Sequence, residues 1–524
     1  MHLFLYGPPG SGKTTLGASL AKAYGMPFCD LDALIETQAG MTVSTIFSIE
    51  GESGFRQREM NNLREAVLQK PTIFALGGGT LLDPQARNLA EAYGQVLCLD
   101  ASLETLKQRL RTERNTRPLL ADDLDQQLEE LLTERGDHYQ SFPMRMETTG
   151  LTIEMMVWNA QSILGRFHIS NMGKPYDALV VDRALDQLGN YLQQYGLRGP
   201  VALVTDQRVG AIYLNQVEAS LHSAGYAVSS LCIEPGETHK TIDAVVSIWD
   251  FFVQSGIDRG STVVALGGGV TGDMAGFAAA TFLRGVDWVN VPTSLLAMVD
   301  SSLGGKTGID LPQAKNLVGA FHAPRLVLAD SRVLTTLPAR ELRNGLGEVV
   351  KHGVIGDVEL FTLCSRGWKV VEENLDWLVR RAIAVKAKVI QQDPYEKGAR
   401  KALNLGHTVG HGIEIASDYR LSHGESVAVG MVVEAGLAEK IGLADNGLAN
   451  QISETLTGLG LPIKIPPGIS PDRMLQAMLL DKKRSEGIVR FALPVKIGQV
   501  EWDVIVDDWQ AIITDTLLSQ GRES

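Results

Sequence analysis

Short apolar runs alternate with stretches of helical periodicity over the first 165 residues. Residues 2–6 (HLFLY), 72–79 (TIFALGGG) and 95–100 (QVLCLD) are apolar runs, and helical spacing follows residue 13 and returns at 151–164. Charged sequence with helical character fills residues 102–135. Strands that alternate with helices are typical of a parallel sheet, so the pattern predicts an α/β domain over residues 1–165.

A junction is predicted at residues 165–177 (GRFHISNMGKPYD), which hold turn residues and little periodicity. Strand-like runs then return at 201–206, 228–236, 261–269 and 286–292, whereas beyond about residue 330 helical spacing of apolar residues dominates. The pattern therefore predicts two further parts: an α/β nucleotide-binding domain at 170–330 and a mainly helical domain at 331–524. The segment NMGKPYDALVVDRAL lacks the glycine turn expected after the first strand of such a domain.

Composition narrows the function classes. A chain of 524 residues is long enough for two to four domains. Its net charge of −13 argues against general nucleic-acid binding, which requires a basic face. Four widely spaced cysteines without a CxxC pair indicate reduced thiols. The opening residues lack a basic signal-peptide region and no apolar run reaches membrane-spanning length, so we expect a cytoplasmic protein that binds no membrane.

The sequence GPPGSGKT at residues 7–14 matches the phosphate-binding loop pattern, follows a predicted strand and enters a predicted helix. The backbone N–H groups around Gly10 and Gly12 are expected to surround a phosphate, Lys13 to add charge and the Thr14 hydroxyl to hold Mg²⁺. A glycine-rich turn without a ligand is the alternative. The motif predicts a nucleotide site and leaves the phosphate acceptor open.

Further motifs in the same region follow in a fixed order: CDLDALIE, GFRQRE, GGGT, TRPLL and ERGDHY. Together with the phosphate loop they make residues 1–165 resemble shikimate kinase. The resemblance implies that ATP and Mg²⁺ bind at the loop with help from Thr15, that Asp30 supports the Mg²⁺ shell and that Arg117 lies in a lid over ATP. It also implies shikimate-binding groups, with Asp32 orienting or deprotonating the attacking hydroxyl: Asp32, Arg56, Gly78, Gly79 and Arg135.

These residues also have structural alternatives. Arg56 and Arg135 could each hold a carboxylate through a planar fork of donors, but either could equally lie on a solvated helix face. Asp30 could be a helix N-cap. The resemblance, and no property of the single residues, favours the functional interpretation.

Polar clusters in the second half suggest a second site. GGGVTGD at residues 267–273 follows an apolar run and resembles a turn that admits a dinucleotide, although it departs from the GxGxxG pattern. HTVGH places His407 and His411 on one helical face, and His423 follows sixteen residues after His407. With Glu348 these residues form a plausible metal set that leaves one position open. Histidines with this spacing are otherwise common in cores and on surfaces.

The segments VPTSLLAMVDSSLGGKTGID, LPARELRNGLGEVVK, ARKALNLGHTVGHGIE and HGESVAVGM extend the match, and residues 175–510 resemble 3-dehydroquinate synthase. The resemblance implies bound NAD, a divalent metal (Zn²⁺ or Co²⁺) and a homodimer. It assigns the metal to Glu348, His407 and His423, and it makes His411 a proton-transfer residue that also meets substrate. The implied NAD set is Asp206, Glu237, Lys240, Gly268, Gly269, Asp273, Thr293, Ser294 and Lys315.

The implied substrate set of the second site is dominated by cations, with Lys306, Lys351 and Asn404 also counted as catalytic. It consists of Asp300, Lys306, Lys351, Lys386, Arg400, Asn404, either Lys482 or Lys483, and Arg284, which is expected to reach the site of a neighbouring subunit. The expected reaction uses transient oxidation by NAD, loss of phosphate, reduction and ring closure by an aldol step.

The sequence as a whole predicts a bifunctional shikimate-pathway enzyme. Its two reactions are phosphorylation of shikimate and conversion of 3-deoxy-D-arabino-heptulosonate 7-phosphate to 3-dehydroquinate. Two alternatives make the second half another sugar-phosphate cyclase or a polyol dehydrogenase. A third makes one half a regulatory scaffold, which the intact set of charged and metal-binding residues disfavours.

Overall fold

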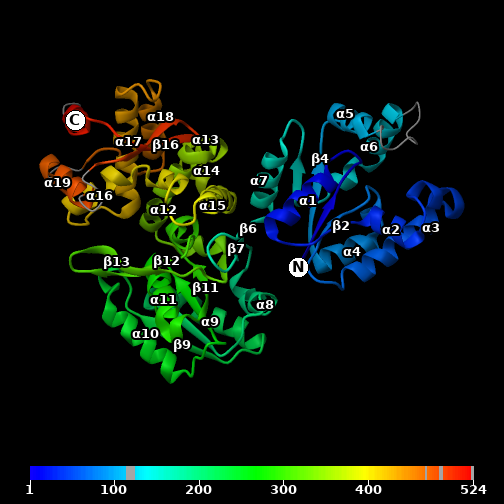
Figure 1. Cartoon of the computed structure of the whole chain (residues 1–524), viewed down its shortest axis with the longest axis horizontal. Coiled ribbons are helices and arrows are strands. Elements are labelled where there is room, and N and C mark those ends of the chain that lie inside the picture. The colour runs from blue at the N-terminus through cyan, green and yellow to red at the C-terminus, as the bar shows by residue number, and fades with distance from the viewer. Residues whose placement is uncertain (114–123, 466–468, 483–487, 521–524) are drawn as a thin grey trace. The chain divides into compact units, whose positions relative to one another are not determined.

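The computed structural model describes residues 1–113, 124–465, 469–482 and 488–520. The chain divides into two compact units, Met1–Leu164 and Gly165–Ser524, and each combines helices with a sheet (Figure 1). The predicted fold class is confirmed: a parallel sheet in the first unit, then a largely parallel sheet followed by a mainly helical part. The division of the second unit at about residue 330 stays a prediction.

The sheet of the first unit has five strands in the order β2-β3-β1-β4-β5, and its neighbouring strands pair in parallel. The strands are β1 (His2–Tyr6), β2 (Phe28–Asp30), β3 (Ile73–Ala75), β4 (Gly94–Asp100) and β5 (Arg145–Glu147). The helices are α1 (Lys13–Tyr24), α2 (Leu31–Ala39), α3 (Val43–Ala66), α4 (Pro84–Tyr93), α5 (Leu103–Glu113), α6 (Leu124–Gln140) and α7 (Ile153–Leu164).

The core of the first unit follows the two-residue period of β1. Phe4 and Tyr6 pack into one buried cluster, while Leu3 and Leu5 pack into another. Because successive side chains of a strand point to opposite faces, both faces of this sheet are covered. The phosphate loop begins directly after Tyr6, so a fully buried strand fixes its starting point.

The larger sheet of the second unit has the order β6-β7-β14-β11-β10-β8-β9, and only the β6–β7 pair is antiparallel. Its strands are β6 (Arg166–Ile169), β7 (Tyr176–Val180), β8 (Val201–Asp206), β9 (Val228–Ile233), β10 (Thr262–Gly267), β11 (Asp287–Pro292) and β14 (Leu326–Ala329). The intervening helices are α8 (Leu188–Gln194), α9 (Gln207–Ser223), α10 (Ile242–Gln254) and α11 (Gly269–Thr281). A separate hairpin joins β12 (Lys306–Leu311) to β13 (Ala314–Phe321).

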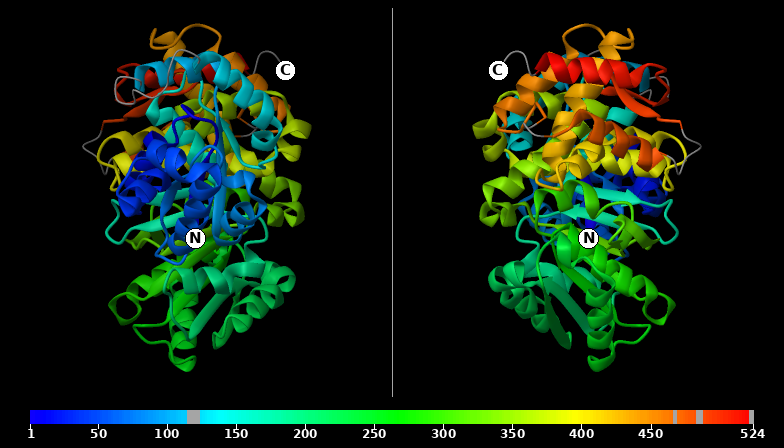
Figure 2. Two further views of the ribbon diagram at one scale, coloured as in Figure 1. Left: turned by 90° about the vertical axis from the view of Figure 1, so that its right-hand side faces the viewer. Right: turned by 90° about the vertical axis from the view of Figure 1, so that its left-hand side faces the viewer.

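The helical part of this unit gathers at one end of its sheet, as both views of Figure 2 show. Its helices are α12 (Ala339–Gly356), α13 (Val358–Ser365), α14 (Trp368–Glu373), α15 (Leu375–Gln392), α16 (His407–Ala416), α17 (His423–Lys440), α18 (Leu448–Gly458), α19 (Pro471–Lys482) and α20 (Trp509–Gln520). A second hairpin joins β15 (Phe491–Lys496) to β16 (Gln499–Val504).

The structure differs from the sequence prediction at the junction. Residues 166–169 and 176–180 are paired strands and not an irregular connection. Half-buried and buried residues alternate along RFHI, as expected for a strand. The segment has only four residues between turn formers, which is too short for this alternation to be recognised in the sequence. The pairing has a polar component, since the buried carboxylate of Asp177 accepts hydrogen bonds from Arg166 and the hydroxyl of Tyr195.

The turn after β7 does without the glycine that we expected. Arg183 adopts the left-handed conformation there, with φ of 56°, which is a strained conformation for a residue with a long side chain.

Among the described residues, none of the helices combines the length and apolar character that a bilayer crossing demands.

The first strand supplies a prediction about pH. The amide of Thr72 donates to Nδ1 of the buried His2 at 3.1 Å, and Nε2 lies 3.0 Å from the carbonyl oxygen of Val67, which requires a neutral ring with its proton on Nε2. Burial lowers the pKa of His2 below 6.5. The unfolded chain therefore takes up the proton first, so stability is full above about pH 6.5 and falls as the pH drops towards the folded-state pKa.

We expect His2→Gln, which cannot titrate, to flatten this acid-side loss of stability in the first unit. Peptide-level hydrogen exchange of β1 and β3 between pH 4.5 and 7.5, corrected for intrinsic rates, measures the effect. Identical pH dependence in the wild type and the variant would show that His2 is not the titrating group.

Candidate functional site

The phosphate loop of the first unit has the backbone that its glycines require. Gly10 and Gly12 take φ values of 77° and 93°, and helix α1 begins at Lys13. The ammonium group of Lys13 donates to the carbonyl oxygens of Gly7 and Pro8, both at 2.9 Å. The loop thus closes around its own lysine at the N-terminus of a helix, where backbone N–H groups and the helix dipole favour an anion.

Thr14 and Asp30 lie together beside this loop. The Thr14 hydroxyl donates to Asp30 Oδ2 at 2.8 Å, while Oδ1 accepts from the amides of Asp32 and Ala33 and caps α2. Asp30 is therefore an N-cap, as one alternative held, and is also in contact with the proposed Mg²⁺ ligand. Thr15 is exposed in the first turn of α1.

The proposed shikimate-binding residues form one cluster at the end of β3. Asp32 and Glu59 both approach Gly77, where an added Cβ would lie 3.1 Å and 3.0 Å from their carboxylate oxygens. At Gly79 a Cβ would lie only 2.4 Å from a guanidinium nitrogen of Arg56. A side chain at either glycine would displace these charged groups, so the glycines make the close approach possible.

Tyrosine hydroxyls and a second carboxylate complete this cluster. The hydroxyls of Tyr6 and Tyr139 donate to the carbonyl oxygen of Gly78 at 3.2 and 2.7 Å. Burial is the main reason that the pKa of Tyr139 rises to about 12, and Arg135, one turn earlier on α6, opposes the rise.

Glu59, which the sequence analysis did not single out, pairs with Arg56 at 2.7 Å. Arg117 lies outside the described residues.

The proposed NAD-binding residues gather at the carboxyl ends of three adjacent strands of the second unit. Asp206 ends β8 and caps α9, Gly268 follows β10 and caps α11, and Thr293 follows β11 and donates to the Gly267 carbonyl at 2.9 Å. Ser294 Oγ would be 3.5 Å from a Cβ at Gly268. In open parallel sheets this edge is where ligands bind.

A buried lysine orders the neighbouring part of the edge. Lys240, only 3% exposed, donates to Asp273 Oδ2 at 2.7 Å and to Asn316 Oδ1 at 2.5 Å, and Glu237 lies 3.9 Å away. Burial raises the pKa of Asp273 to about 6 even though the charge of Lys240 opposes the rise. Gly269 approaches Ser301, where an added Cβ would lie 2.9 Å from the hydroxyl oxygen.

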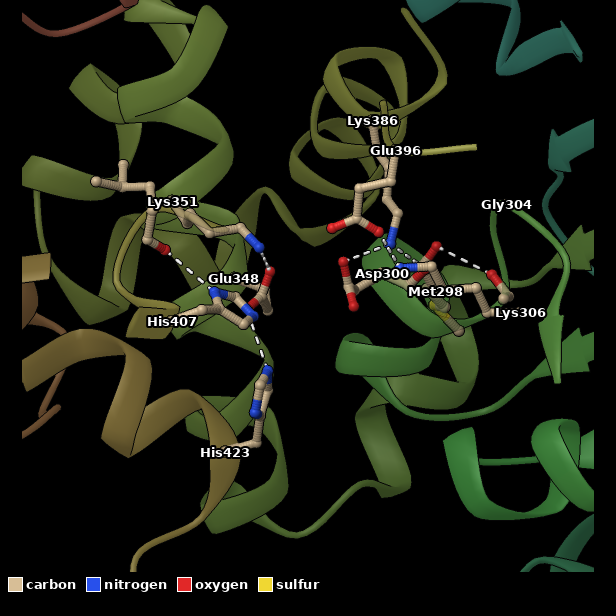
Figure 3. Close-up of polar contacts among 12 residues, drawn as sticks. Met298, Asp300, Gly304, Lys306, Glu348, Lys351, Lys386, Glu396, His407 and His423 are labelled. Atoms are coloured by element: carbon tan, nitrogen blue, oxygen red, sulfur yellow. Dashed lines mark hydrogen bonds and ion pairs between the residues drawn. The ribbon is translucent and has the colours of Figure 1, made fainter. Parts of the chain in front are cut away.

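Three helices bring Glu348, His407 and His423 together. Glu348 is fully buried on α12, and its Oε1 lies 3.6 Å from Nε2 of His407 on α16 and 3.4 Å from Nε2 of His423 on α17 (Figure 3). Four ligands at zinc distances lie about 3.4 Å apart in a tetrahedron, so this spacing fits a divalent ion. One Nε2 or Nδ1 atom from each of His407, His411 and His423 also lies within 4.8 Å of the others.

The surroundings of these three groups favour a bound cation at Glu348 and His407 and oppose it at His423. Burial works against ionisation of Glu348, but the charge of Lys351 and the two histidines hold its pKa well below the usual value. Burial also lowers the pKa of His407, which favours the neutral imidazole that a metal needs. Hydrogen bonds with Glu348 and Glu414 overcome burial and raise the pKa of His423 to about 10, so a metal there must displace a proton.

The proposed substrate-binding cations lie beside this metal set. Lys386 donates to the Asp300 carbonyl at 2.7 Å and to its carboxylate at 2.5 Å, while Lys351 pairs with Glu348 (Figure 3). Burial opposes ionisation of Asp300, yet the charge of Lys386 keeps the pKa of this carboxyl below its usual range. Arg400 packs on Gly304, where an added Cβ would lie 2.3 Å from its guanidinium.

Glu396 is a member of this cluster that the sequence analysis missed. Its carboxylate pairs with Lys306 and accepts a hydrogen bond from Asn404 at 3.2 Å. Burial opposes ionisation, but the charge of Lys306 and these two bonds hold the pKa of Glu396 below its usual value. The residue takes a left-handed φ of 60° in the turn before η7 (Ala399–Asn404). Its partner Lys306 lies ninety positions away in sequence, so no local signal could have found it.

His352 is a second residue that sequence reasoning missed. It is fully buried next to Lys351, and one of its ring nitrogens lies within 4.8 Å of carboxylate oxygens of both Asp300 and Glu348. Burial and the charge of Lys351 lower its pKa to about 3, so the ring is neutral.

Three residues of the predicted substrate set remain: Arg284, Lys482 and Lys483. Arg284 lies beyond the C-terminal end of α11, whereas Gly268 lies at the other end of that helix, a separation of about 20 Å for thirteen residues. The main chain of Lys482 ends α19, but its side chain and all of Lys483 lie outside the described residues.

Family models match both units. One described as 3-dehydroquinate synthase N-terminal matches residues 230–344, one described as 3-dehydroquinate synthase C-terminal matches 345–484, and a shikimate kinase model matches 9–163. The 3-dehydroquinate synthase of Pelobacter propionicus is 47% identical over 334 residues, which are 63% of this chain and 93% of that protein.

Solved structures resemble the second unit. The 2-epi-5-epi-valiolone synthase of Streptomyces hygroscopicus subsp. jinggangensis 5008, with NAD⁺ and Zn²⁺ bound, matches with a TM-score of 0.61 and 29% identity over 67% of this chain and 97% of that one. A 2-deoxy-scyllo-inosose synthase complexed with carbaglucose-6-phosphate, NAD⁺ and Co²⁺ matches with a TM-score of 0.61 and 26% identity over 68% and 99%.

The shikimate kinase model thus covers the first unit, which holds the phosphate loop. The two 3-dehydroquinate synthase models cover the glycines at the strand edge and the metal-spaced histidines of the second unit. The chain belongs to the 3-dehydroquinate synthase family through its second unit and carries a shikimate kinase domain in its first, as a bifunctional enzyme of the shikimate pathway.

Proposed function

We propose that the second unit converts 3-deoxy-D-arabino-heptulosonate 7-phosphate to 3-dehydroquinate with release of phosphate. One observation carries the proposal: the metal-spaced set of Glu348, His407 and His423 adjoins a lysine-rich cluster. Lys351 pairs with Glu348, and carboxylate oxygens of Glu348 and Asp300, the partner of Lys386, lie within 4.8 Å of each other. A substrate with both a carboxylate and a phosphate requires such cations, and a polyol does not. The 47% identical relative has this activity by name.

Each charged group has a proposed role. Lys351, Lys386 and Arg400 hold the anionic ends of the substrate, and Arg400 can do so through a bidentate fork. Glu348, His407 and His423 would hold Zn²⁺ or Co²⁺, and the residues at the ends of β8, β10 and β11 would hold NAD. When bound, the metal supplies polarisation of substrate hydroxyls and NAD supplies a reversible hydride acceptor.

Two side chains, those of Glu396 and His411, are proposed to transfer protons. Glu396 is held ionised between Lys306 and Asn404, so its carboxylate can accept a proton from a substrate that meets these residues. His411 lies beside the metal set and can serve as a second proton carrier. Arg284, at the far end of α11 from the NAD edge, is assigned the role of completing the partner's site in a homodimer.

The first unit is proposed to transfer phosphate from ATP to the 3-hydroxyl of shikimate. Arg56 and Arg135 take the carboxylate, and Asp32 binds the reacting hydroxyl and orients or deprotonates it. Lys13 and Mg²⁺, held by Thr14 with support from Asp30, offset charge on the transferred phosphoryl group, and Arg117 is assigned to the lid. Incubation of the purified chain with each substrate set tests both proposals, with 3-dehydroquinate and shikimate 3-phosphate as the expected products.

Lys13→Ala is expected to reduce kinase activity by a hundredfold or more, about 3 kcal/mol of transition-state stabilisation, because it removes a charge that faces the transferred phosphoryl group. Synthase activity of the same preparation should stay near the wild-type value. Parallel loss of both activities would contradict two independent sites.

His407→Ala and His423→Ala are each expected to lower metal content, whereas His411→Ala should retain metal and lose turnover by ~10²–10⁴-fold. A ligand contributes directly to metal affinity, but a proton carrier does not. Metal analysis of the three purified variants, with activity measured after addition of excess zinc, separates the roles. A folded, metal-free His411→Ala protein would make His411 a ligand.

Glu396→Gln is expected to lower synthase turnover by about a hundredfold or more, because an amide cannot accept the proton. NAD affinity and metal content should stay unchanged. Glu372→Gln, at an exposed position on α14, is the matched control. Near-normal turnover of Glu396→Gln would exclude the carboxylate as a proton acceptor.

A further inference from the structure

Tyr419 combines strain with exposure. It follows α16 and takes a φ of 58°, and the preceding Asp418 takes 51°, so two consecutive residues with side chains lie in the left-handed region. Such conformations are costly and persist where the surroundings stabilise them. The tyrosine is 49% exposed, so burial of its ring does not explain the conformation.

The end of α16 directs this side chain. The amide of Tyr419 donates to the Glu414 carbonyl at 2.9 Å, and the amide of Asp418 donates to the Ile415 carbonyl at 3.2 Å. These two hydrogen bonds are those of a Schellman motif, in which a helix ends with a residue in the left-handed conformation. Arg473 on α19 pairs with Asp418 at the surface of this turn. The hydrogen bonds of the helix end thus hold the backbone from which the Tyr419 side chain extends.

The ring faces a cation from a different part of the unit. The ammonium of Lys315, on hairpin strand β13, lies 4.4 Å from the centroid of the Tyr419 ring, within the range of a cation–π contact. Lys315 is one of the residues assigned to NAD. The contact therefore joins the hairpin to the turn that follows α16, the helix that begins with the proposed metal ligand His407.

The charges near Lys315 come from both sides of this contact. Burial raises the pKa of Glu237, beside the NAD edge, while Lys240 and Lys315 oppose the rise. Burial also opposes ionisation of Glu414, yet His423, His411 and Lys315 hold the pKa of that carboxyl below its usual value. Lys315 thus lies between acids of the NAD edge and of the metal set, and either could attract its flexible side chain.

We infer that Tyr419 is a positioning residue for NAD, whose ring keeps the ammonium of Lys315 at the NAD edge. The inference rests on the proposed function, because it needs Lys315 to contact the dinucleotide. Without the ring, Lys315 keeps its charge but loses its fixed place and must be ordered when NAD binds.

Measurement of NAD affinity by calorimetry tests the inference in the full chain. Tyr419→Leu is expected to raise the dissociation constant for NAD about two- to fivefold, the size of an exposed cation–π contact, and Tyr419→Phe to restore it almost fully. Metal content and thermal unfolding should not change, because the ring is exposed. Ile415→Ala is the matched control and should bind NAD normally, because Ile415 lies on α16 just before this turn and is 39% exposed.

A double-mutant cycle shows whether Tyr419 affects NAD affinity through Lys315 or through another contact. Tyr419→Leu should have no effect in a Lys315→Met background, since the cation is then missing. An equal weakening in both backgrounds, or wild-type affinity of Tyr419→Leu, would overturn the inference. Absence of NAD binding by the wild-type chain would instead refute the proposed function itself.

Discussion

The buried carboxylate of Glu348 is the constraint on which the arrangement of the second unit depends. A charge without exposure to water needs positive groups or donors around it. Lys351 supplies one from the next turn of α12, and the imidazoles of His407 and His423 approach from two other helices. Segments up to 75 positions apart must therefore meet at one point, and that convergence creates the spacing that suits a divalent ion.

Glycines allow the three helices to come this close. A Cβ at Gly347 of α12 would lie 2.4 Å from the Gly424 carbonyl oxygen in α17, and one at Gly430 would lie 2.0 Å from the Gly406 carbonyl oxygen before α16. Real Cβ atoms do not tolerate such distances, so larger residues would push the helices apart and separate the proposed metal ligands. The geometry of the proposed metal set therefore depends on backbone packing as much as on the ligands themselves.

The sequence predicted the parts of the structure whose requirements are local. The phosphate loop needs a strand, a run of glycines and a helix start in consecutive residues, and all three were visible. The glycine turn before α11 was also predicted from consecutive residues, GGGVTGD at 267–273. Glu396 could not be found, because its place depends on a left-handed turn and on Lys306 from a distant hairpin. Strand β6 was missed because four residues are too few to establish a period.

In the functions proposed above, the two units would bind phosphate in physically different ways. In the first, one helix start presents backbone donors and a single lysine, an arrangement that suits a nucleotide whose phosphates keep their Mg²⁺ counterion. In the second, Lys351 and Lys386 come from helices and are already paired with carboxylates. An anionic substrate must compete with Glu348 and Asp300 for these cations, so binding there redistributes charge within the site. In the proposed reaction, this redistribution offers a way to couple proton transfer to the release of phosphate.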